Sequence, residues 1–162
     1  MNSIKKLYEK LWKSLIRPQN FPYFKDDLGD QFLIFENTCS IRMDFCLQNP
    51  LNEKFNISVY FPCTESQNII IDCPMMIYAH THNGNRLEGL NLVEYFVKKK
   101  IGFVAMDFRA NGYSTGKYVT LGWYEALDLN TVVNFLRQNV KTKILGIWGR
   151  SMGASATILF LS

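Results

Sequence analysis

A serine between two glycines, near the C-terminal end of the chain, has the setting of a nucleophile. The pattern Gly-x-Ser-x-Gly spans residues 149–153 and directly follows a short apolar run, residues 144–148. A sharp turn from a strand into a helix strains the backbone of the serine and requires neighbours without bulky side chains. Gly149 and Gly153 provide that room. We therefore predict a tight corner that lifts the Ser151 hydroxyl above the edge of a sheet.

A loop containing two histidines, His80 and His82, follows another apolar run, residues 75–79. Such a loop can aim a backbone N–H at the point where an oxyanion develops, together with the N–H of Met152 at the start of the next helix. The His-x-His spacing also suits a metal site. However, the chain has no third histidine, and the next carboxylate is Glu88. We therefore predict contacts that order the loop and no metal site.

A third polar segment begins at Asp107, after the apolar run 101–106. Its carboxylate has two interpretations: the acid of a catalytic triad, or a cap for backbone N–H groups in a turn that Gly112 and Gly116 allow to bend. We favour the second and predict that Asp107 organises the loop.

The elements that position these segments alternate along the second half of the chain. The three apolar runs are typical of parallel strands covered on both faces, and helical patterns separate them at residues 86–100 and 123–138. In the second helix we expect Trp123 to face inward and Glu125 and Asp128 to face outward. Alternating patterns earlier in the chain predict antiparallel strands at 31–35, 41–47 and 55–61. The predicted fold is α/β, a mainly parallel sheet with helices on both faces and antiparallel N-terminal strands.

Composition places these elements in an ordinary globular chain. It has 162 residues, 48% of them apolar, and a formal net charge of +4. Residues 1–17 account for the whole excess of basic side chains, so the rest is balanced, which argues against a nucleic acid partner. The four cysteines form no C-x-x-C pair, and we find no signal peptide pattern and no apolar stretch of membrane-spanning length. We expect a reduced, cytoplasmic setting.

The N-terminal segment, residues 1–20, predicts an amphipathic helix before a domain at 21–162. Apolar residues recur at spacings of three and four, with lysines between them: Ile4, Leu7, Leu11, Trp12 and Leu15. One interpretation is a helix packed on the domain. The other is a basic helix in weak peripheral contact with an anionic membrane surface. Hydropathy does not separate the two.

Taken together, the three polar segments resemble the α/β-hydrolase superfamily, in the branch of serine aminopeptidase-like proteins, monoacylglycerol lipases and acyl-protein thioesterases. The resemblance covers about residues 40–162. It implies that Ser151 is the nucleophile of a serine hydrolase, and that Met152 supplies one oxyanion-hole N–H. The backbone of Thr81 or His82 would supply the other. The implied substrate is a small molecule or an acyl or peptide compound, cleaved at an ester, thioester or amide bond without a cofactor.

Two positions depart from the pattern of that branch, because Thr81 and Ala110 stand where glycine is usual. A triad also needs an acid and a histidine after the serine, and residues 152–162 contain none. We therefore expect both groups to lie beyond residue 162, in a longer domain, and this chain alone to be inactive. Two alternatives are a non-catalytic scaffold with the same shape and a dinucleotide-binding domain, whose G-x-G-x-x-G motif is absent.

Overall fold

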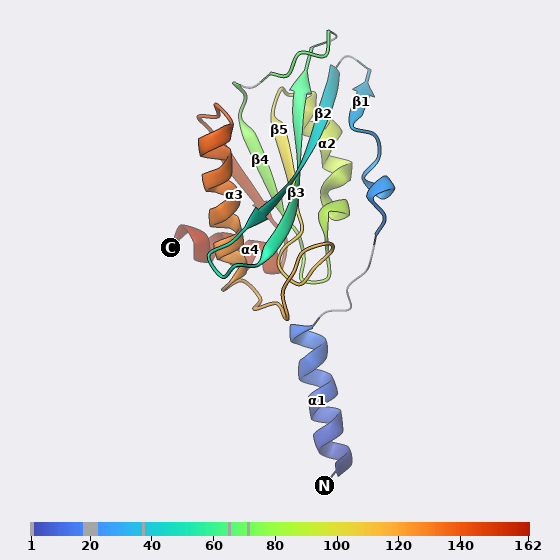
Figure 1. Ribbon diagram of the computed structural model, residues 1–162, viewed down its shortest axis with the longest axis vertical. Coiled ribbons are helices and arrows are strands. Elements are labelled where there is room, and N and C mark those ends of the chain that lie inside the picture. The colour runs from blue at the N-terminus through green and yellow to red at the C-terminus, as the bar shows by residue number, and fades with distance from the viewer. Residues whose placement is uncertain (1, 18–22, 37, 65, 71) are drawn as a thin grey trace.

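The computed structural model describes residues 2–17, 23–36, 38–64, 66–70 and 72–162. It contains one six-stranded mixed sheet with helices on both faces (Figure 1). The predicted boundary between residues 20 and 21 lies outside the described residues. The predicted α/β class, with antiparallel strands first and parallel strands later, is confirmed.

The sheet has the strand order β1-β2-β3-β5-β4-β6. Its first three strands form an antiparallel meander, and β3 also runs antiparallel to β5. The remaining contacts, β4 with β5 and β4 with β6, are parallel. The strand bounds are β1 Phe32–Phe35, β2 Thr38–Gln48, β3 Lys54–Cys63, β4 Met75–Ala79, β5 Gly102–Met106 and β6 Leu145–Gly149.

Side chains that alternate along the central strands build a separate core on each face of the sheet. On one face, Ile77 and Val104 belong to the cluster that α3 (Glu125–Asn139) and α4 (Met152–Leu161) cover. On the other face, Tyr78 and Phe103 pack with residues of α2 (Val93–Val97). All five residues of β5 are buried. Covering a strand from both sides explains why its sequence is an unbroken apolar run.

The helix predicted at 86–100 differs from the one observed. A 3-10 helix, η2, spans Arg86–Leu92, and only Val93–Val97 is α-helical. Gly89 lies so close to the rings of Tyr78 and Phe103 that a Cβ would collide with them. The narrower 3-10 coil brings the backbone to this distance from the sheet.

Because β4, β5 and β6 are parallel, their C-terminal ends lie at the same edge of the sheet. This edge is the lower end of the sheet in Figure 1, opposite the arrowhead of β3. The loops that follow Ala79, Met106 and Gly149 all leave from it. Beyond this edge lies α1 (Asn2–Ile16), and the short 3-10 helix η1 (Lys25–Leu28) leads into β1.

Two predictions for the helix expected at 123–138, which is observed as α3, are wrong. Trp123, expected inside, is 67% exposed, whereas Glu125 and Asp128, expected in solvent, are fully buried. The Glu125 carboxylate accepts the backbone N–H groups of Thr120 and Gly122 at 2.8 Å, and therefore fixes the turn that leads into the helix. The Asp128 carboxylate accepts a side-chain N–H of Asn49 at 2.7 Å. Burial raises the pKa of Asp128 to about 6.

Candidate functional site

Ser151 occupies a strained corner between β6 and α4. Its backbone has φ 51° and ψ −116°, a conformation that residues with a side chain rarely adopt. Such a conformation costs about 1–3 kcal/mol and persists only where the surroundings enforce it. Here the Arg150 N–H donates to the carbonyl of Ala79 at 3.0 Å, and the Ser155 N–H donates to the Ser151 carbonyl at 3.1 Å. The Ser151 side chain is exposed at the outside of this corner.

The two glycines of the corner are required by close packing. A Cβ at Gly153 would overlap the carbonyl of Ala79, at the end of the neighbouring strand β4. A Cβ at Gly149 would collide with the Gly153 carbonyl and the backbone of Ala154. Any side chain at either position would push the helix away from the strand, and with it the serine.

Met152 begins α4 with its side chain buried and its N–H unused. The next two N–H groups along the chain, those of Gly153 and Ala154, donate to the carbonyls of Arg150 and Ser151. Within the part of the chain that the structure describes, the Met152 N–H has no acceptor. A free N–H at a helix N-terminus, beside the serine, can stabilise a developing negative charge.

The loop after β4 is organised by one carboxylate, Glu88. Both its oxygens lie 3.3 Å from the Thr81 nitrogen, and one accepts the Thr81 hydroxyl at 2.7 Å. The Tyr78 hydroxyl donates to the same carboxylate at 2.9 Å. Burial and this hydrogen bond raise the pKa of Tyr78. Thr81 therefore anchors this loop to Glu88.

This arrangement distinguishes the two backbone donors that the resemblance left open. The N–H of Thr81 already faces Glu88. In contrast, the N–H of His82 has no acceptor among the described residues, while the His82 carbonyl accepts a side-chain N–H of Asn111 at 2.8 Å. His82 is therefore the residue of this loop with a donor to spare.

The loop and the corner are also linked to each other. The Arg150 guanidinium lies 3.7 Å from the Glu88 carboxylate, so the residue before the serine contacts the carboxylate that holds the loop. The Arg150 side chain is 67% exposed, and an ion pair of this kind adds little stability. This contact places the positive charge of Arg150 and the loop after β4 on the same side of the corner.

His80 is buried and links the loops after β4 and β5. Its Nε2 accepts the Phe108 N–H at 3.0 Å, so the proton of the neutral ring lies on Nδ1, which is 2.5 Å from the Thr81 carbonyl. Burial lowers the pKa of His80. Because both ring nitrogens are engaged within the protein, this histidine is placed neither as a base for Ser151 nor as a metal ligand.

Asp107 organises its loop, as the sequence predicts. The carboxylate is fully buried and accepts the Arg86 N–H at 2.7 Å, the Tyr113 N–H at 3.1 Å and the Tyr23 hydroxyl at 2.7 Å. The Arg86 guanidinium lies 3.2 Å from it. Burial and the Asp107 charge raise the pKa of Tyr23. This cluster fastens the start of η2 to the end of β5.

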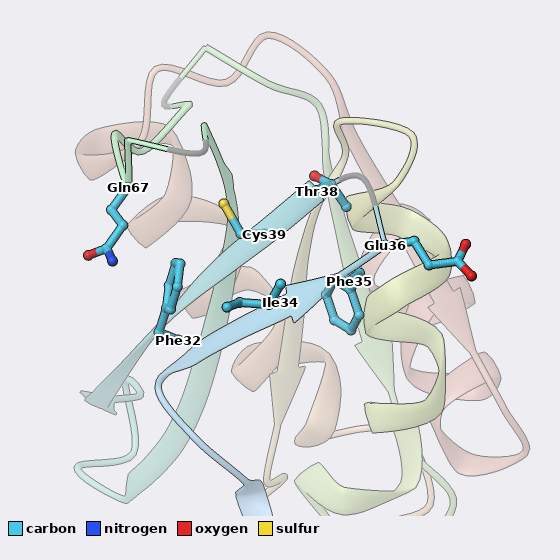
Figure 2. Close-up of a pocket in the computed structure, with 7 residues that line it drawn as sticks. All are labelled: Phe32, Ile34, Phe35, Glu36, Thr38, Cys39 and Gln67. Carbon is cyan, nitrogen blue, oxygen red and sulfur yellow. The ribbon is translucent and has the colours of Figure 1, made fainter.

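A separate groove lies at the other end of the strand order (Figure 2). Its walls come from β1, the turn into β2, the start of β2 and the loop after β3: Phe32, Ile34, Phe35, Glu36, Thr38, Cys39 and Gln67. The sheet places β1 first and β6 last. This groove therefore does not belong to the corner that carries Ser151.

These features define a class of protein. The mixed sheet with antiparallel strands first, and the corner between β6 and α4, correspond to about half of an α/β-hydrolase domain. The chain therefore has the α/β-hydrolase fold over that half.

Several known proteins are similar to this chain. The structure of the esterase Pf2001 from Pyrococcus furiosus aligns with a TM-score of 0.67 and 28% identity, over 90% of this chain and 52% of that one. An esterase from Exiguobacterium antarcticum aligns with a TM-score of 0.58 and 17% identity, over 74% of this chain and 40% of that one. The uncharacterized protein YqkD of Bacillus subtilis (strain 168) is 34% identical over 86 residues.

The chain spans about half the length of the first of these structures. Its match to YqkD covers 52% of this chain and 28% of YqkD. No family model matches the chain.

Proposed function

We propose that the chain carries the nucleophile of a serine hydrolase, with Ser151 attacking the carbonyl carbon of an ester, thioester or amide. The observation that carries this proposal is the backbone of Ser151, at φ 51° and ψ −116° on a corner between strand and helix, with an exposed side chain. Strain of this kind costs stability and persists mainly where function uses it. The finer resemblance, to the serine aminopeptidase and monoacylglycerol lipase branch, belongs to this proposal.

In the proposed reaction, Ser151 Oγ forms a bond to the carbonyl carbon, and the carbonyl oxygen takes the electron pair and becomes an oxyanion. The N–H groups of Met152 and His82 donate to that oxyanion. A histidine outside residues 1–162 accepts the serine proton and returns it to the leaving alcohol, thiol or amine, while an acid, also outside these residues, orients the histidine and stabilises its positive charge. Water then hydrolyses the acyl-enzyme by the same steps. No cofactor takes part.

An ester is the favoured substrate class, because the relative with 28% identity over 90% of the chain is an esterase. The polar loops after β4 and β5 would then contact a small acyl substrate at the sheet edge. Glu88 has a positioning role in this proposal, since its bonds to Thr81 and Tyr78 set the loop that presents the His82 N–H.

A fluorophosphonate probe, which labels activated serines, tests the proposal on the full-length gene product. We expect labelling that disappears in Ser151→Ala and persists in Ser155→Ala, a matched exposed serine four residues further along. Absence of labelling in the full-length protein would overturn the proposal and favour a non-catalytic scaffold.

The proposal also holds that the catalytic base lies outside residues 1–162. The same probe and an aryl ester, applied to the 162-residue chain, test this. We expect no appreciable turnover, because a serine hydroxyl without a base is a poor nucleophile. Ester hydrolysis by this chain that depends on Ser151 would show that the base lies within residues 1–162.

A further inference from the structure

Helix α1 presents an apolar stripe that no other described part of the chain covers. The stripe follows helical spacing, and its members are between 57% and 75% exposed: Ile4, Leu7, Leu11 and Leu15. Figure 1 shows α1 standing clear of the sheet and of the helices that pack on it. The end of α1 contacts the rest of the chain through a hydrogen bond from the Val119 N–H to the Ile16 carbonyl, at 2.8 Å.

One side of α1, next to the apolar stripe, is strongly basic. At about 100° per residue, three lysines of the helix and the arginine directly after it fall within one arc that does not overlap the stripe: Lys6, Lys10, Lys13 and Arg17. Glu9 is the single acidic residue of the segment and lies 3.7 Å from Lys13. The helix therefore combines an uncovered apolar stripe with an excess of positive charge, whereas the rest of the chain is electrically balanced.

We propose that α1 docks on an anionic lipid surface, lying in the plane of the interface. Leu7 and Leu11 would enter the boundary between headgroups and acyl chains, and the lysines would remain among anionic headgroups. Trp12 is half-buried at the margin of the stripe, where an amphipathic ring suits the interface. In the described part of the chain, no helix is long and apolar enough to cross a membrane.

The positive charge of α1 favours an anionic lipid surface over a second copy of the chain as the partner that covers the apolar stripe. Pairing two α1 stripes would bring two basic helices together and would be opposed by repulsion between like charges. An anionic surface instead gains from every lysine near it, while the stripe is removed from water in either case. The proposal concerns α1 alone and does not depend on Ser151.

Vesicle co-sedimentation of the whole chain tests this. We expect binding to phosphatidylcholine vesicles that contain phosphatidylserine, weakened at high salt, and at least about tenfold weaker binding to pure phosphatidylcholine. Leu7→Asp with Leu11→Asp should abolish binding. Lys6→Glu with Lys10→Glu should reduce the affinity for the anionic vesicles about tenfold or more.

Matched variants on the body of the protein make the result specific. Ile158 and Leu161 on α4 are 69% and 72% exposed, so Ile158→Asp with Leu161→Asp removes comparable exposed apolar surface and should leave binding unchanged. Lys99→Glu with Lys100→Glu repeats the charge change on exposed residues outside α1 and should have a much smaller effect. The proposal is overturned by absence of binding, by equal binding to both vesicles, or by a dimer that Leu7→Asp dissociates in the absence of lipid.

Discussion

The loops after β5 and β6 leave the same edge of the sheet but are held in opposite ways. Asp107, after β5, is fully buried and accepts hydrogen bonds from Tyr23, Arg86 and Tyr113. Ser151, after β6, is exposed, strained, and without a hydrogen-bond partner for its hydroxyl among the described residues. The comparison separates structural polar groups, which are buried and satisfied, from a group that is available for chemistry.

The strands that carry these loops differ in the same way. Every residue of β5 is buried between two layers of helices, whereas no residue of β6 is fully buried, and Trp148 is 46% exposed. In the described part of the chain, β6 pairs with β4 alone. Thus the loop after β5 is held by several buried hydrogen bonds, whereas the corner after β6 meets the sheet through its close contacts with Ala79.

Removing the Asp107 carboxylate should have the largest effect on stability. Asp107→Ala removes the buried carboxylate 3.2 Å from the Arg86 guanidinium, which keeps only Asp44, at 3.5 Å, as an acidic neighbour. It also removes the acceptor of the Arg86 and Tyr113 N–H groups, and breaking a buried ion pair in this way costs about 3–5 kcal/mol. The free energy of unfolding, measured by urea denaturation, checks this. Asp30→Ala, at an exposed carboxylate, should change it by less than about 0.5 kcal/mol. A loss below about 1 kcal/mol in Asp107→Ala would contradict the structural role.

Adding one methyl group at the corner after β6 should have the next largest effect. In Gly153→Ala, the new Cβ overlaps the Ala79 carbonyl, and we expect a loss of about 1–3 kcal/mol from overpacking. The matched variant Ser155→Ala, on the exposed side of the same helix, should be close to neutral. Equal stabilities in urea denaturation would mean that α4 does not depend on its contact with β4.

The sequence predicted those parts of the fold and site whose signals are local. The apolar runs identify β4 and β5 because a strand covered on both faces needs apolar residues throughout. The same pattern identifies β6, although its residues are less buried. The glycines around Ser151 predict a tight corner because only a residue without a side chain fits there. The catalytic roles of Ser151, Met152 and His82 remain predictions.

Contacts between distant segments could not be predicted in this way. Asp128 looked like a solvent-facing residue of a helix, but its partner Asn49 lies 79 positions earlier in the chain. Glu88 likewise occupies an ordinary helical pattern, and its role depends on Thr81 and Tyr78, which the fold brings around it. The sequence around a single acidic residue does not indicate which N–H groups will donate to it in the folded chain.

Acidification should destabilise the link between the loops after β4 and β5. Burial lowers the pKa of His80 below its ordinary 6.5, so the unfolded chain binds the proton more readily than the folded one. Stability from this group is therefore complete above about pH 6.5 and is lost as the pH falls below it, by at most about 1.4 kcal/mol per pH unit. Urea denaturation at several pH values should show that this pH-dependent part of the free energy of unfolding is absent in His80→Gln. His82→Gln, at a side chain that is not buried, should retain it.

Releasing the strain at Ser151 should have the smallest effect, and the opposite sign. Glycine adopts φ 51° without the steric cost that serine incurs, so Ser151→Gly should raise the free energy of unfolding by about 1 kcal/mol. In Ser155→Gly, within the regular part of α4, the same change should lower it by about 0.5–1 kcal/mol. Urea denaturation of both variants compares the two positions directly. If Ser151→Gly were destabilised like Ser155→Gly, the serine would not be strained, and the contrast between the two loops would rest on exposure alone.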